Sequence, residues 1–348
     1  MVNKTVYDLY DWKEDVSGKY ILSTCVQSII LVVGVIGNAF VITIYTWHLK
    51  PKKDDRYFIP ILAWIDLLGC IFASAKSLVE NQYPLKYISS FSCKILNFGT
   101  AIFIVSSILL LMVISVQRYQ KICRPFGFQM TLKVKRIAAI LTILLAGTLS
   151  VQSFIMHENV KVFHENRNIS GYECASVPGT LKDSFQYIII VIEGFSIVCM
   201  CLMYGLVGRA IMKRFGREED VTSDKNGEPN HNSRNKLISR RRFSLMFMLI
   251  SLVSIVCFIT SWTFILLQRK DPAFWRKLSF GQAQVSLIFR RFYILNHAVN
   301  PLFYGFFDPK FRRQMKTLFY NFKRYITRNV RDVKLDLSAD SSQQSEMS

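Results

Sequence analysis

The segment Asn296–Arg313, NHAVNPLFYGFFDPKFRR, combines polar residues in an apolar helix with a helix-breaking proline. The apolar run that contains its first part, Leu287–Phe307, is long enough to cross a hydrocarbon core about 30 Å thick. Asn296 and Asn300 lie inside this run, and Pro301 removes one backbone hydrogen-bond donor. Polar groups survive in lipid only where they face protein or trapped water. The segment therefore predicts a membrane-spanning helix whose polar face points into a helix bundle.

The residues after Asp308 and Pro309 form a different pattern, in which apolar side chains recur every three or four residues opposite a row of cations. The apolar set is Phe311, Met315, Leu318 and Phe319, and the cations are Lys310, Arg312, Arg313 and Lys316. This pattern predicts an amphipathic helix over residues 308–325 that lies flat on anionic membrane lipid.

The composition of the whole chain agrees with a membrane protein, because its 348 residues are 51% hydrophobic and 14% aromatic. Seven apolar segments are each long enough to span a bilayer. They are Tyr20–Trp47, Tyr57–Val79, Ile95–Gln117, Ile137–Met156, Ser184–Gly208, Phe243–Gln268 and Ala283–Phe307. We predict an all-α membrane protein with a seven-transmembrane helix bundle over residues 20–307. It lies between an extracellular N-terminus, 1–19, and a polar, serine-rich cytoplasmic tail, 326–348, which we expect to be disordered.

The net charge of +20 would suggest nucleic acid as a partner if it lay on one soluble face. It lies instead in alternate loops. If the N-terminus is outside, the inner segments carry 29 Lys and Arg and the outer segments carry 12. This bias predicts an outside N-terminus and excludes nucleic acid. The Asn-x-Ser/Thr sequons at Asn3 and Asn168 fall on the same outer side, where we expect glycans. Cys93 and Cys174 also fall there, where disulfides persist.

Motifs on several of these helices resemble those of the rhodopsin-like (class A) G-protein-coupled receptors, and the resemblance covers about residues 20–325. The motifs are Gly37-Asn38 with Val41, Leu62-Ala63 with Asp66, Cys93, Gln117-Arg118-Tyr119 with Pro125, Phe258 with Trp262, and Asn300-Pro301 with Tyr304. The resemblance implies a plasma-membrane receptor that transmits an extracellular ligand signal to a heterotrimeric G protein. The activation switch that it implies consists of Gln117, Arg118, Tyr119, Tyr204, Trp262, Asn300, Pro301 and Tyr304. It further implies a disulfide of Cys93 with Cys174, and arrestin-like and receptor-kinase partners for the serine-rich tail.

The chain departs from the family pattern in ways that mark a divergent member. Gln117 stands where the family has an acid, and a neutral amide holds the Arg118 guanidinium less firmly than a carboxylate does. We therefore predict raised basal activity, with the alternative that Gln117 is a tolerated variant. Ser196 and Phe264 replace prolines of the fifth and sixth helices, and Ser261 replaces a cysteine.

Asp66 is a carboxylate at mid-membrane, which is costly unless it is hydrated, paired or protonated. In the class A receptors that this chain resembles, the equivalent aspartate binds a sodium ion together with polar residues of the third and seventh helices. The matching set in this chain is Asp66, Ser107, Asn296 and Asn300. His297 departs from the small residue usual at its position and would compete with sodium. The alternative is a structural carboxylate bonded to Asn38 and Asn300.

The class of ligand is limited mainly by binding residues of related receptors that this chain lacks. Thr100 stands where amine receptors of the family carry an aspartate, and Ile294 stands where opsins carry the retinal lysine, so neither a biogenic amine nor retinal is expected. The candidate ligand-binding residues are Lys76, Thr100, Glu193, Arg269 and Arg290. Arginine at a cavity suits an anionic small molecule, lipid or peptide. The alternative is that Glu193 and Glu80 pair with these cations and that no anionic ligand is required.

Two other function classes stay open from the residues alone. A seven-helix transporter or channel would use charged residues such as Asp66, Glu193 and Arg290 as a relay, and an orphan receptor would signal basally without a diffusible ligand. An enzyme is not expected, because the five histidines form no catalytic or zinc-binding arrangement with Ser, Asp or Glu. We expect no cofactor other than the sodium ion.

Overall fold

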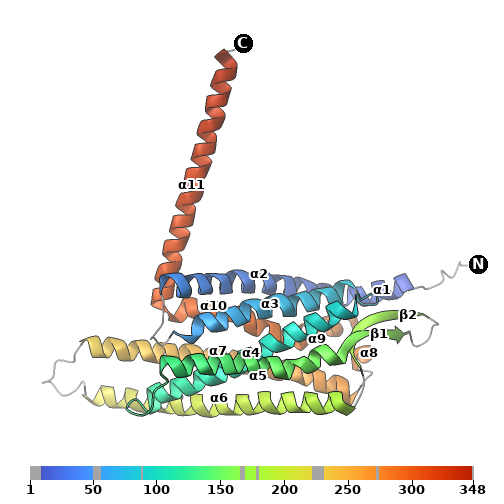
Figure 1. The fold of residues 1–348 in the computed structure, drawn as a ribbon, viewed down its shortest axis with the longest axis horizontal. Helices are drawn as coiled ribbons and strands as arrows, with labels where there is room; N and C mark the ends of the chain where they lie inside the picture. Colours follow the sequence, from blue (N-terminus) through green and yellow to red (C-terminus); the bar gives the residue numbers. More distant parts are fainter. Residues whose placement is uncertain are drawn as a thin grey trace, which may run out of the picture.

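The computed structural model describes residues 9–49, 56–87, 89–164, 169–177, 180–221, 231–271 and 274–346. The elements in chain order are α1 (Leu9–Gly18), α2 (Ile21–Thr43), the π-helical turn η1 (Ile44–His48), α3 (Phe58–Gln82), α4 (Ser90–Cys123), α5 (Leu132–Met156), β1 (His157–Phe163), β2 (Ser170–Ser176), α6 (Thr180–Val221), α7 (His231–Lys270), α8 (Phe274–Lys277), α9 (Phe280–Arg290), α10 (Phe292–Phe307) and α11 (Pro309–Glu346). The long helices of the bundle run side by side along one axis (Figure 1).

The two ends of the bundle differ in what they carry. The β1–β2 hairpin, α1 and α8 lie at one end, and α11 leaves the bundle from the other (Figure 1). We call these the disulfide end and the α11 end. Inside the bundle α4 packs against α3, α5 and α6, and α10 packs against α2, α3 and α7. These contacts place α4 and α10 where they can share polar groups.

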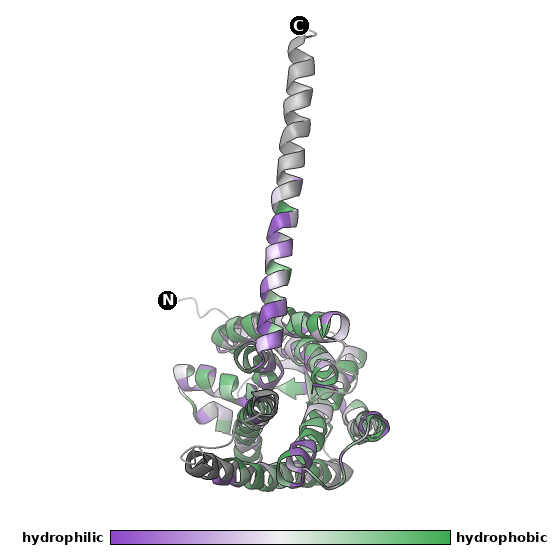
Figure 2. Cartoon of the chain, turned by 90° about the vertical axis from the view of Figure 1, so that its left-hand side faces the viewer, coloured by the Kyte–Doolittle hydropathy of each residue, from purple (hydrophilic) through white to green (hydrophobic). Residues whose placement is uncertain are grey.

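The outer faces of the helices are apolar, as a membrane requires. Large hydrophobic side chains such as Ile29, Leu141, Val191 and Leu252 are exposed, and hydrophobic residues are frequent throughout the ring of helices (Figure 2). Within the described residues, six helices are long and apolar enough to cross a membrane. The predicted seven-transmembrane bundle is confirmed, with its seventh span divided into α9 and α10.

The division of the seventh span occurs at Arg291. The amide of Ile294 returns to the Arg291 carbonyl oxygen at 3.0 Å, which makes a tight turn between the two helices. The amide of Tyr293 donates to the Ser261 hydroxyl of α7 at 3.2 Å. A buried amide without a partner would be costly. Ser261 therefore stabilises the break, and neither half alone has the length of a spanning helix.

Pro301 creates a second irregularity in α10, because it supplies no amide to the carbonyl group four residues earlier. That carbonyl belongs to His297. The Asn38 side-chain amide donates to it at 2.8 Å, and also to the Gly34 carbonyl at 2.9 Å. An asparagine of α2 thus replaces the hydrogen bond that the proline removes.

The segment after α10 is a single helix, α11, which continues to Glu346. Its first turns separate the two faces as expected: Phe311 is buried, Met315 packs on the core, and Lys310, Arg312 and Arg313 are exposed. The helix passes residue 325, beyond which we expected disorder. The sequence after Pro309 contains neither glycine nor proline, so no residue in it interrupts a helix.

Candidate functional site

Asp66 is at the centre of the bundle with a fully buried side chain. One carboxylate oxygen lies 2.8 Å from His297 Nδ1, and the other accepts from the Asn300 amide at 2.6 Å. The Ser107 hydroxyl approaches the first oxygen more loosely, at 3.5 Å. Asn38, which we considered as a partner of Asp66, bonds backbone carbonyls instead. Sequence reasoning thus found the cluster and expected His297 to compete with sodium there, but it did not predict the hydrogen bond of His297 with Asp66.

Asn296 links this cluster to α4 and α7. Its side-chain amide donates to the Ser107 hydroxyl at 3.3 Å, and its carbonyl oxygen accepts from the Ser254 hydroxyl at 2.5 Å. The four residues of the predicted sodium set are therefore brought together, from α3, α4 and α10. They meet around the ring of His297, so the space beside Asp66 is shared with an imidazole.

A cavity of about 530 Å³ opens between the helices toward the disulfide end. Four of the five predicted ligand-binding residues line it: Lys76, Thr100, Glu193 and Arg290. The side chain of the fifth, Arg269, lies outside what the structure describes. The rest of the lining is mainly apolar, and Trp262 belongs to it. A second cavity, of about 290 Å³, shares Lys76 and Arg290 with the first. The two cations therefore lie where the cavities meet.

The inner part of the larger cavity holds a buried carboxylate. Glu193 is 5% exposed and accepts a hydrogen bond from the Trp262 side chain. The Thr100 hydroxyl is also buried, and among the described residues it has no hydrogen-bond partner. Polar groups of this kind suit a ligand that can form hydrogen bonds with them.

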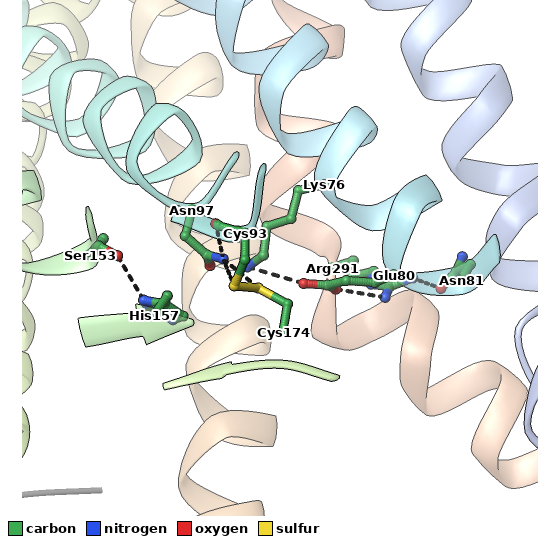
Figure 3. Close-up of polar contacts among 9 residues, drawn as sticks. All are labelled: Lys76, Glu80, Asn81, Cys93, Asn97, Ser153, His157, Cys174 and Arg291. Atoms are coloured by element: carbon green, nitrogen blue, oxygen red, sulfur yellow. Dashed lines mark hydrogen bonds and ion pairs between the residues drawn. A yellow bond between two sulfur atoms is a disulfide. The ribbon is translucent and has the colours of Figure 1, made fainter. Parts of the chain in front are cut away.

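Arg291 has a structural role that differs from that of its neighbour Arg290. Its guanidinium donates to the Asn81 side-chain oxygen at 2.7 Å and to Glu80 at 3.3 Å (Figure 3). It also donates to the Ser23 hydroxyl at 3.1 Å. Lys76 lies farther from Glu80, at 3.8 Å. Glu80 is thus satisfied mainly by Arg291. No ion pair of Arg290 with a carboxylate within 4 Å is found in the described part of the chain.

The rim of the smaller cavity is fixed by a disulfide between Cys93 and Cys174, as predicted (Figure 3). It joins the first turn of α4 to β2, which pairs antiparallel with β1. Asn97, one turn further along α4, donates to the Cys93 carbonyl oxygen at 2.9 Å. Burial raises the pKa of Glu173 on β2, and the nearby Glu80 carboxylate adds to the rise. The hairpin therefore forms part of the wall of this cavity, through His157 on β1 and residues 173–176 on β2.

The predicted switch residues at the α11 end are mostly buried. Arg118 is 1% exposed, and its guanidinium is 3.4 Å from the Gln117 carbonyl oxygen, a long hydrogen bond. The same guanidinium covers the ring of Phe247 on α7. Tyr204 and Tyr304 are buried in the same core cluster as Phe247. Tyr119 is only half-buried and packs on a separate small cluster with α6. Trp262 belongs to the cavity and lies apart from this group.

A buried ion pair beside this group was not predicted. Asp308, between α10 and α11, accepts from Arg56 Nε at 2.7 Å and from the Tyr45 hydroxyl at 2.6 Å. Its other oxygen accepts the Lys310 amide at 2.9 Å, which caps α11. The Arg56 guanidinium also lies over the ring of Phe243 on α7. In the sequence, the position of Asp308 next to a row of cations could have indicated an ion pair. The four Lys or Arg in residues 48–56 were equally plausible partners, so Arg56 could not be chosen among them.

Two predicted residues cannot be placed. The sequons at Asn3 and Asn168 lie outside the described residues. Glycosylation therefore stays a prediction.

The seven-transmembrane receptors of the rhodopsin family match this chain over residues 37–304, more than half of its length. The chain belongs to that family, the class A G-protein-coupled receptors. The type-1 angiotensin II receptor of Homo sapiens is 25% identical over 316 residues, which cover 84% of this chain and 79% of that receptor. The receptor of the same name from Meleagris gallopavo is 31% identical over 156 residues, 43% of this chain and 42% of its own.

Among solved structures, the crystal structure of squid rhodopsin has the same fold. The TM-score is 0.67 with 18% identity, and the match covers 86% of this chain and 85% of that one. These relatives are receptors, so the chain is a multi-pass membrane receptor and not an enzyme.

Proposed function

We propose that the chain is a plasma-membrane receptor that carries a signal from a ligand at the disulfide end to a heterotrimeric G protein at the α11 end. One observation carries the proposal: α7 contains both Trp262, which lines the ligand cavity, and Phe247, which contacts Arg118. A ligand that moves Trp262 therefore acts on the helix that covers the arginine. Binding would shift the bundle toward a form in which Arg118 meets the G protein.

The orientation rests on the distribution of charge. Placing the disulfide end outside leaves 29 Lys and Arg in the cytoplasmic segments against 12 outside. The N-terminus, with the sequon at Asn3, is then extracellular. The basic cytoplasmic face attracts anionic lipid, and serines near the C-terminus serve as phosphorylation sites for a receptor kinase and an arrestin-like partner.

The ligand carries an anionic group, which we place between Lys76 and Arg290. Both side chains line the two cavities, and within the described part of the chain Arg290 has no carboxylate partner like the one that Arg291 has in Glu80. A guanidinium at a partly apolar cavity suits a carboxylate or phosphate. An acidic small molecule, lipid or peptide meets this requirement.

Coupling is tested by guanine-nucleotide exchange on heterotrimers of each subtype, with the purified receptor in lipid nanodiscs. We expect exchange above receptor-free discs, and loss of at least tenfold of that excess in Arg118→Ala. Lys133→Ala, an exposed cation at the start of α5, is the matched control and should keep its activity. Currents that scale with expression and vanish in Asp66→Asn, without exchange on any subtype, would support a channel instead.

The ligand is sought by thermal stabilisation of the receptor with acidic metabolites, lysophospholipids and peptides. A compound that binds in the cavity should stabilise the wild type and Lys277→Ala but not Arg290→Ala. Lys277 is an exposed cation paired with Asp271 at the same end. Equal stabilisation of all three proteins would place the compound elsewhere.

A further inference from the structure

The position beside Asp66 where a cation would bind is filled by a side chain of the protein itself. His297 Nδ1 is 2.8 Å from one Asp66 oxygen, and the side chains of both residues are fully buried. The second oxygen is occupied by the Asn300 amide at 2.6 Å. Sodium needs several oxygen ligands around it. Here the shortest contacts of the carboxylate are with two nitrogens, and the Ser107 hydroxyl is farther away at 3.5 Å, so the residues present do not fit a bound sodium ion.

The imidazole is held in this place from three sides. Gly69 lies against the ring, and a Cβ added to this glycine would be 2.9 Å from three ring atoms. The His297 carbonyl is bonded to Asn38, which fixes the backbone beneath the ring. Asp66 orients the ring through Nδ1. Room for the imidazole is therefore part of the fold, because any larger residue at 69 would displace it.

Among the described residues, Asp66 is contacted by side chains from two helices. The groups that face it are Ser107 from α4 and His297 and Asn300 from α10. One oxygen of the carboxylate therefore has its closest contact with His297, and the other has its closest contact with Asn300.

We propose that His297 is a built-in substitute for a metal cation at Asp66, so that this receptor does not bind sodium there. Sodium is replaced by a covalently attached donor that cannot dissociate. Gly69 leaves the space that the His297 ring occupies, so the two residues together make this substitution possible. The stability of the receptor is then independent of whether the salt cation is sodium.

The proposal predicts that removing the ring creates a sodium site. In His297→Ser, a hydroxyl replaces the imidazole and leaves space beside Asp66 for an ion with oxygen ligands from Asp66, Ser107 and Asn296. The purified receptor is melted in sodium chloride and in choline chloride at equal ionic strength and one pH. The wild type should melt at the same temperature in both salts. His297→Ser should melt about 2–4 °C higher in sodium, and Asp66→Asn/His297→Ser should lose that difference.

A second measurement tests the position of the ring without any salt effect. Gly69→Ala should destabilise the wild type, because its Cβ meets the imidazole, but should have little effect in His297→Ser. Equal effects of Gly69→Ala in both backgrounds would overturn the proposed pairing. Sodium-specific stabilisation of the wild type that disappears in Asp66→Asn would overturn the substitution itself. Neither experiment needs a ligand or a G protein, so the outcome is independent of the proposed signalling function.

Discussion

The guanidinium carbon of Arg118 lies 4.8 Å from the centre of the Phe247 ring, so a cation of α4 covers an aromatic face of α7. One turn earlier on α7, Phe243 is covered in the same way by Arg56 at 4.3 Å. Residues four apart lie on one face of a helix. Two arginines from different parts of the chain thus hold the same face of α7 at the α11 end, where Gln117 provides only a long hydrogen bond.

Replacing Phe247 by leucine should raise ligand-independent G-protein activation. A buried cation–π contact contributes about 0.5–2 kcal/mol. If it is lost when α7 moves outward, its removal shifts the resting equilibrium by about twofold to thirtyfold. The measurement is basal nucleotide exchange at equal receptor density. Phe247→Trp retains an aromatic face and serves as control, and a basal rate that is unchanged in Phe247→Leu would contradict the role of this contact.

Replacing Asp308 by alanine should destabilise the receptor strongly. Arg56 would remain buried without its carboxylate, and breaking a buried pair in this way costs about 3–5 kcal/mol. The Tyr45 hydroxyl and the first turn of α11 would also lose their acceptor. Thermal melting in detergent measures the effect.

The control for that variant is Asp271→Ala. Asp271 forms an ion pair with Lys277 at the disulfide end, but both side chains are substantially exposed, at 36% and 67%. An exposed pair contributes about 0–1 kcal/mol. Similar losses in the two variants would mean that burial does not determine the strength of the Arg56–Asp308 pair.

Removal of the disulfide should also lower stability. Cys93 and Cys174 are 81 residues apart in sequence, and a cross-link over such a loop contributes about 2–5 kcal/mol. Cys93→Ser is compared with Cys25→Ser, which removes an exposed free thiol. We expect a lower melting temperature only in the first variant, and a reducing agent should bring the wild type close to it.

The pH dependence of stability should report on Glu173. Burial raises the pKa of this carboxyl above its ordinary value, so the folded protein binds the proton more tightly than the unfolded chain does. The stability from this group is present at low pH and is lost as pH rises through the folded pKa. Glu173→Gln should therefore gain in melting temperature relative to wild type as pH rises above the ordinary pKa of a glutamate. A gain that is constant as pH rises would contradict the shift.

The number and order of the spanning helices could be predicted because each needs a long apolar run. The first predicted span, Tyr20–Trp47, corresponds closely to α2 with η1, Ile21–His48. α4 extends past Ile95–Gln117 at both ends, because a helix continues in polar residues after it leaves the apolar layer. The apolar pattern thus locates the membrane and not the helix ends.

The contacts between helices were harder to predict than the helices. The apolar run indicated that Asn296 and Asn300 lie in one spanning helix with a polar face toward the bundle, and the family resemblance added Asp66 and Ser107. The departure at His297 predicted competition with sodium, but the direct contact of the imidazole with Asp66 was not predicted, since it depends on the space over Gly69. The break at Arg291 was missed for a related reason: its hydrogen-bond partner, Ser261, is distant in sequence.

The bond of the Tyr293 amide to Ser261 limits how α7 and α10 move against each other. If α7 slid along its own axis, that amide would lose its hydrogen bond in an apolar interior. Leaving a buried donor without a partner costs about 1–3 kcal/mol. A sideways tilt pivoting near Ser261 leaves the bond intact. The hydrogen bond to Ser261 therefore favours a sideways tilt of α7 about this point over a sliding motion along the helix axis.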